Sequence, residues 1–179
     1  MIELSLLIWA LSGFFAYVGW LRGWTKELIA LSGIVLSLFA LSEFDTLIRQ
    51  TLFGDLPPGQ VFYIQSAIFV AIVFFAYQTR ALGGGSSGRG SRRDSRDELQ
   101  TKALGAIVGF TNGYLISGTI WYFLDIANYP LGGLVIAPRP GSPSAALLDN
   151  LPLYVLAGGD GSLLSLLVVI LFVIVLVLI

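Results

Sequence analysis

Residues 104–117 read LGAIVGFTNGYLIS, and this stretch decides the fold. Small side chains recur in it every four residues, so a helix would place them on one stripe. In lipid, helices associate through close packing of small residues, because apolar side chains gain little by leaving a lipid environment. We therefore expect a membrane-spanning helix whose stripe packs against another helix of this bundle or of a partner. The stripe consists of Gly105, Gly109, Gly113 and Ser117, and its expected counterparts on two earlier stretches are Ser12, Ala16, Gly33 and Ser37.

The composition of the whole chain favours the same class of protein. Of its 179 residues, 56% are hydrophobic and only 12% are charged, whereas a soluble domain carries about 25% charged residues. A bilayer core needs roughly 20 helical residues, and lipid cannot satisfy an open strand edge. We predict an all-α, polytopic transmembrane bundle with four to five spans. The apolar stretches are Leu4–Leu21, Leu28–Leu41, Val61–Tyr77, Ala103–Leu124 and Leu163–Ile179.

Basic residues are concentrated in the odd-numbered connections between these stretches. The first and third connections hold eight of them near the spanning ends, beginning with Arg22 and Lys26, whereas the second and fourth hold only Arg49 and Arg139. Because basic residues near spanning ends stay cytoplasmic, we predict the N-terminus outside and the C-terminus inside. The second apolar run is short, which leaves open that the first hairpin is re-entrant and does not cross the bilayer.

Three regions follow from this pattern. Residues 1–125 form a four-helix membrane region with a flexible, Gly/Ser-rich cytoplasmic linker at 81–98, either a solvated spacer or an arm that touches anionic headgroups. Residues 126–162 form an external connection with a short amphipathic helix, N-capped at Ser142 before Pro143. Ser42–Phe53 also has an amphipathic pattern, and the two segments are either lids on the bundle or a docking surface. Residues 163–179 form an additional transmembrane helix.

The residue types limit the chemistry. The chain has no Cys and no His, so it lacks thiols, imidazole ligands and the usual nucleophile–base pairs. We expect no enzyme, no catalytic residue, no cofactor and no metal site. Polar groups at membrane depth often mark a transport path, and the candidates are Gln65, Thr111 and Asn112. None is ionisable, Glu27 is expected at an interface, and Asn112 is expected to hydrogen-bond Gln65.

Two motifs resemble the colicin V production protein (CvpA) family. The first contains Gly19, Arg22, Gly23 and Glu27, and the second combines 104–106 and Gly109 with Gly113 and 123–125. The resemblance implies a bacterial inner-membrane protein of four helices, named for toxin production or export. This sequence departs from the family pattern at Asn112, where family members often have a basic residue. In the first motif we expect a sharp turn at Gly23, with Glu27 paired with Lys26 or Arg22. The side chains of Arg22 and Lys26 can also reach lipid phosphates or the carbonyls at a helix C-terminus.

Two functions are compatible with these features. The first is a non-catalytic scaffold or accessory subunit of a larger membrane assembly, such as a photosynthetic or respiratory complex. The second is a channel or export component, for which the candidate polar residues would line the path. The expected partners are membrane lipids and other membrane protein subunits, with no nucleic acid. The fifth stretch ends without a basic anchor, so either the chain continues beyond Ile179 or another subunit holds this helix.

Overall fold

The described part of the chain is helical and contains no strand. The computed structural model describes residues 3–45, 51, 54–78, 95–131, 133–158 and 162–178. The predicted all-α fold is confirmed, and α1 to α4 are each long and apolar enough to cross a membrane. The helices are α1 (Leu4–Arg22), α2 (Trp24–Glu43), α3 (Pro58–Gln78), α4 (Ser95–Ile126), α5 (Pro143–Leu148), α6 (Pro152–Leu156) and α7 (Ser162–Leu178).

The first two helices are joined by a single residue, Gly23. Its φ of +81° lies in the left-handed region that favours glycine. Helix α2 begins at Trp24, four residues before the predicted start, because the apolar pattern alone does not count the polar first turn. With 19 and 20 residues, α1 and α2 each reach about 30 Å. The shortness that suggested a re-entrant hairpin is therefore absent.

Helix α4 begins inside the predicted linker. Its first residue is Ser95, so residues 95–98 are helical, while residues 81–94 lie outside the described residues. Asp97 and Glu98 occupy the first turn, where negative charge interacts favourably with the helix dipole. Glu98 also pairs with Lys102 one turn later, with Oε1 and Nζ 2.7 Å apart. The predicted flexible linker was therefore wrong at residues 95–98, because acidic residues that suit a solvated linker also suit the first turn of a helix.

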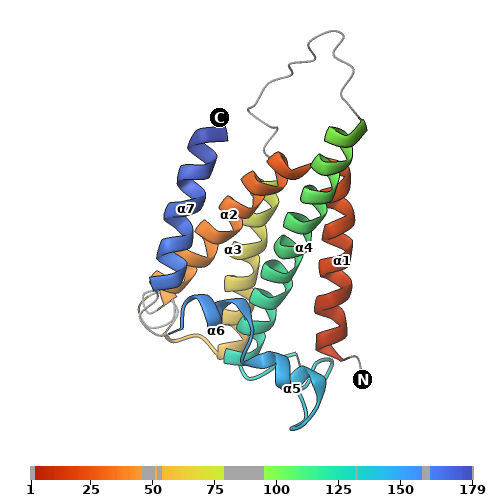
Figure 1. The fold of residues 1–179 in the computed structure, drawn as a ribbon. Helices are drawn as coiled ribbons and strands as arrows, with labels where there is room; N and C mark the ends of the chain where they lie inside the picture. The colour runs from red at the N-terminus through yellow and green to blue at the C-terminus, as the bar shows by residue number, and fades with distance from the viewer. Residues whose placement is uncertain are drawn as a thin grey trace.

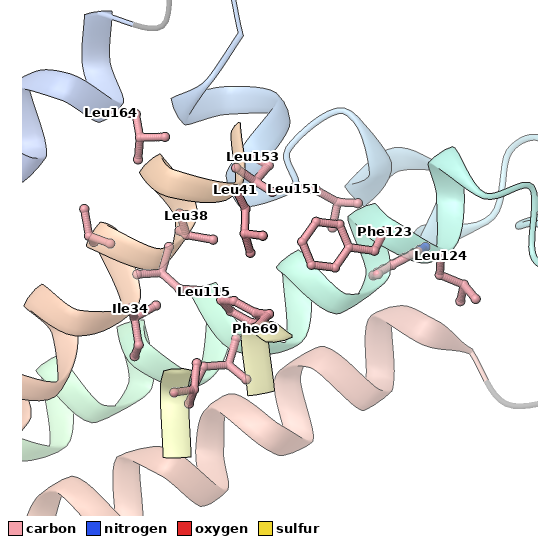
Figure 2. Packing of buried hydrophobic residues seen from close by; sticks show 14 of the residues in the cluster. Ile34, Leu38, Leu41, Phe69, Leu115, Phe123, Leu124, Leu151, Leu153 and Leu164 are labelled. Atoms are coloured by element: carbon pink, nitrogen blue, oxygen red, sulfur yellow. The ribbon is translucent and has the colours of Figure 1, made fainter. Parts of the chain in front are cut away.

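Helix α4 occupies the centre of the bundle (Figure 1). It packs against α1 on one side and against α2 and α3 on the other, while α7 packs mainly against α2 at the edge. Helices α1 and α7 start at the same end of the bundle, the end that carries α5 and α6. We call the segment with α5 and α6 the cap. The buried core joins α2, α3 and α4 to the cap and to α7, and Figure 2 shows it through Ile34, Leu38, Phe69, Leu115, Phe123, Leu151 and Leu164.

The external connection forms two short helices instead of one amphipathic segment. The predicted cap is confirmed, since the Ser142 hydroxyl accepts a hydrogen bond from the backbone N–H of Ala145 at 3.2 Å. A second helix starts at Pro152, because proline suits a first turn and disrupts a helix interior. Most of the second predicted amphipathic segment, Ser42–Phe53, lies outside the described residues, and α2 continues to Glu43.

Candidate functional site

Helices α1 and α4 meet backbone to backbone along their glycines. A Cβ added to Gly19 would lie 2.0 Å from the carbonyl oxygen of Gly105, and one added to Gly105 would lie 2.3 Å from that of Gly19. A Cβ on Gly109 would lie 2.3 Å from the Phe15 oxygen, and one on Gly113 would lie 2.7 Å from the Ser12 Cα. No side chain fits at these positions. The structure thus places these three glycines of the predicted stripe inside one bundle, against α1.

The other small residues of the sequence prediction have different neighbours. Gly33 approaches the Ala76 side chain of α3, where an added Cβ would lie 2.6 Å from the Ala76 Cβ, so it does not serve α4 as predicted. The buried hydroxyls of Ser37 and Ser117 bond to carbonyls of their own helices, at 2.6 Å each. The sequence reasoning missed Gly118, where an added Cβ would lie 2.4 Å from Pro152 Cδ of α6. Gly118 lies outside the four-residue repeat, so periodicity could not find it.

The family-like turn places a carboxylate inside the bundle. Glu27 has no exposed surface. The sequence predicted it near a membrane–water interface, which its place in the first turn of α2 is compatible with, but its burial among the helices was not predicted. The reason is that α2 starts at Trp24, which puts Glu27 within its first turn, facing inward. Of the two predicted partners, Arg22 forms the ion pair, with Nη1 and Oε1 3.0 Å apart. This charged group was not predicted among the buried polar residues of the bundle.

Two further helices complete this cluster, which we call the hairpin cluster (Arg22, Glu27, Tyr77 and Asn112). The Tyr77 hydroxyl of α3 donates to Glu27 Oε2 at 3.1 Å, and Asn112 Nδ2 of α4 donates to the same oxygen at 2.9 Å. Arg22 Nη2 donates to the backbone oxygen of Tyr77 at 3.1 Å, and its guanidinium lies 4.6 Å from the centre of the Tyr77 ring. Four helices therefore meet at one carboxylate.

The electrostatics of the hairpin cluster favour a structural role. A buried carboxylate is costly unless it is paired and hydrogen-bonded, and Glu27 receives Arg22, Tyr77 and Asn112 as donors. Arg22 also sits at the C-terminal end of α3, where a cation is favourable. The side chain of Arg22 retains 21% exposure, enough to reach the bundle surface. Asn112 Oδ1 is buried without a hydrogen-bond partner.

The comparisons with known proteins identify this architecture. The family model described as colicin V production protein matches residues 4–135. The chain belongs to the colicin V production protein family. The match covers α1 to α4, the hairpin cluster and the glycine contacts, whereas α5, α6 and α7 lie beyond it. No curated protein and no solved structure matches the chain.

Within this colicin V production family region, the three candidate pathway residues do not meet. Thr111 is exposed on α4 and its hydroxyl bonds to the Ile107 carbonyl of the same helix at 3.1 Å. Gln65 is fully buried and donates to Asp45 Oδ1 at 3.2 Å, whereas Asn112 donates to Glu27. The predicted bond between Asn112 and Gln65 is wrong, because the Asn112 amide donates to Glu27 of α2 and the Gln65 amide donates to Asp45, which follows α2. The channel or export hypothesis, which needs a shared path, is not favoured.

At the far end of α4, Asp125 holds the cap in place. Its Oδ1 accepts from the Tyr129 hydroxyl at 2.9 Å and its Oδ2 accepts from the Tyr154 hydroxyl of α6 at 2.8 Å. Burial of the hydroxyl raises the pKa of Tyr129 to about 12, and the Asp125 carboxylate contributes to the same shift. The hydrogen bond from Trp121 acts in the opposite direction. Among the described residues, no three His, Cys, Asp or Glu side chains gather into a metal-binding group. Both carboxylate clusters thus join segments of the chain to one another.

Proposed function

We propose that this protein is a non-catalytic scaffold or accessory subunit of a larger membrane assembly. The observation that carries the proposal is the hairpin cluster, in which a fully buried carboxylate is committed to donors from three other helices. Chemistry or transport needs a group that can exchange its partner, whereas Glu27 is neutralised by Arg22 inside the bundle. The glycines of the family-like motifs, Gly19, Gly105, Gly109 and Gly113, serve the packing of α1 against α4.

Helix α7 is the surface that we assign to a partner subunit. It lies beyond the family match and packs mainly against α2, so the four-helix region is formed without it. Its 17 residues are almost entirely Leu, Ile and Val, and its outward side chains are widely exposed. We infer that a transmembrane helix of another subunit covers this face. A photosynthetic or respiratory complex would offer such a helix.

Purification in mild detergent tests the proposal. The protein should elute with partners in fixed stoichiometry, and a bulky Val173→Trp substitution on the outward face of α7 should release them. Val70→Trp on α3 is the matched control, since Val70 and Val173 are 48% and 52% exposed. A lone monomer in the gentlest detergents, or equal partner recovery from both variants, contradicts the accessory role.

We further propose that the protein resides in a bacterial inner membrane with the linker in the cytoplasm. The chain has no Cys, so a single introduced thiol reports the side on which it lies. Asp149→Cys in the cap should react with an impermeant maleimide in intact spheroplasts, whereas Ser91→Cys should react only after lysis. The reverse pattern contradicts the orientation deduced from the basic residues.

A further inference from the structure

A hollow of about 230 Å³ lies at the cap end of the bundle, where α1 begins. One wall is the start of α1, and the other is the connection between α4 and α5. The family-like motifs do not contribute to it, and the proposed partner face on α7 is elsewhere. Its lining residues include Glu3, Leu4, Leu7, Leu134, Ile136 and Arg139.

A hydrogen bond fixes the two walls relative to each other. The hydroxyl of Ser144, which is only 4% exposed, donates to Glu3 Oε2 at 2.8 Å. The hydroxyl oxygen of Ser144 in turn accepts a hydrogen bond from the backbone N–H of Ser5 at 3.2 Å. Helix α5 is thereby attached to the first turn of α1. The hollow is framed by covalently distant segments that already hold each other without a ligand.

The apolar side of the hollow continues along the lipid-facing surface of α1. Leu7 lines the hollow and is 46% exposed, and Leu11 and Phe14 follow at spacings that keep them on the same helix face. On the opposite wall, Leu134 is 89% exposed and Ile136 is 46% exposed, although this connection lies outside the spanning helices. Exposed apolar residues beside a membrane-facing helix are satisfied by an acyl chain.

The polar side of the hollow carries charges of both signs. Glu3 comes from the α1 wall and Arg139 comes from the connection. A carboxylate accepts hydrogen bonds from a primary ammonium, and a guanidinium is suited to phosphate. A simple anion would interact only with Arg139, and an acyl chain alone would interact with neither of the two charged side chains. A ligand that matches every wall combines an apolar chain, a phosphate and an ammonium.

We propose that this hollow binds one membrane phospholipid with an ethanolamine headgroup. The phosphate lies at Arg139, the ammonium lies at Glu3, and one acyl chain follows Leu7, Leu11 and Phe14 along α1. A choline headgroup cannot donate an N–H bond to Glu3, and a glycerol headgroup has no cation. The site therefore selects ethanolamine lipids over choline and glycerol lipids with the same acyl chains.

Native mass spectrometry of the full chain tests the site. Detergent-purified protein is mixed with phosphatidylethanolamine, phosphatidylcholine or phosphatidylglycerol of identical acyl composition. We expect one ethanolamine lipid to be retained with an affinity at least about tenfold above the other two. Arg139→Gln and Glu3→Gln should each remove most of that preference, as expected for the loss of one charge-assisted hydrogen bond.

Controls separate this result from misfolding and from other ligands. Gln at position 3 keeps an acceptor for Ser144, and circular dichroism checks the helix content of each variant. Asp149→Asn, an exposed change on the same cap but outside the hollow, should keep the preference. Equal retention of the three lipids, or an unchanged preference in both charge variants, overturns the proposal. Binding of free phosphoethanolamine as tight as that of the lipid also overturns it, because the acyl groove would then contribute nothing.

Discussion

Two helix contacts in this molecule are built in opposite ways. Helices α1 and α4 touch through glycines whose missing side chains let the backbones meet, whereas α7 rests on α2 through large aliphatic side chains such as Leu164 and Leu171. Backbone contact admits one registry and no added atoms, while interdigitating aliphatic side chains adjust to small shifts. The first contact lies within the family match, and the second joins an edge helix beyond that match to the bundle.

The largest effect should come from adding a side chain to the glycine contact. Gly109→Leu would place atoms where the Phe15 carbonyl already lies, so α1 must separate from α4. We expect loss of the folded protein, a change of more than about 4 kcal/mol. Size-exclusion chromatography and circular dichroism in mild detergent would measure it.

Gly13→Leu on α1 is the matched control for that substitution. A Cβ at Gly13 would meet nothing within 4 Å, so this variant should behave as the wild type. If Gly109→Leu were as stable as Gly13→Leu, the backbone contact between α1 and α4 would not exist in solution.

The hairpin cluster should give the next largest effect. Arg22→Gln leaves the Glu27 carboxylate buried without its cation, which costs about 3–5 kcal/mol. The exposed pair of Glu98 and Lys102 provides the comparison, because Glu98→Gln should cost less than about 1 kcal/mol. Denaturation in detergent would compare the two, and similar losses would contradict the burial of Glu27.

The contact between α7 and α2 should be more tolerant. Leu171→Ala removes a side chain that is 5% exposed, but lipid or neighbouring aliphatic groups can fill the space. We expect a loss below the 2–5 kcal/mol typical of a soluble core. Thermal unfolding would measure the change. A loss as large as that of Arg22→Gln would mean that α7 is an integral part of the bundle core.

The smallest effect is a pH dependence at the cap. The raised pKa of Tyr129 means that the unfolded chain loses this proton first as the pH increases. The stabilising contribution is complete below pH 10 and disappears as the pH rises from about 10 to about 12. Tyr129→Phe should flatten the stability profile in this range, and a profile identical to that of the wild type would contradict the raised pKa of Tyr129.

The sequence predicted those features that depend on one helix at a time. Apolar length located the spanning helices, and the four-residue repeat located Gly105, Gly109 and Gly113. The burial of Glu27 could not be predicted in this way, because it depends on α3 bringing Tyr77 over the hairpin and on α4 bringing Asn112 beside it. Gly33 was predicted to contact α4 but contacts α3, for the same reason. A small residue indicates that a close helix contact exists, but the sequence does not indicate which helix makes it.

Thermal unfolding of Asn112→Leu in detergent tests most directly whether the buried polar residues hold the bundle together. Leu has a similar volume but cannot donate to Glu27, so the carboxylate loses one of its donors. The structure predicts a melting temperature lower by about 5 °C, corresponding to an unsatisfied buried group. A polar residue kept for transport at the expense of stability would instead give an unchanged or higher melting temperature in this variant, and that result would contradict the structural role.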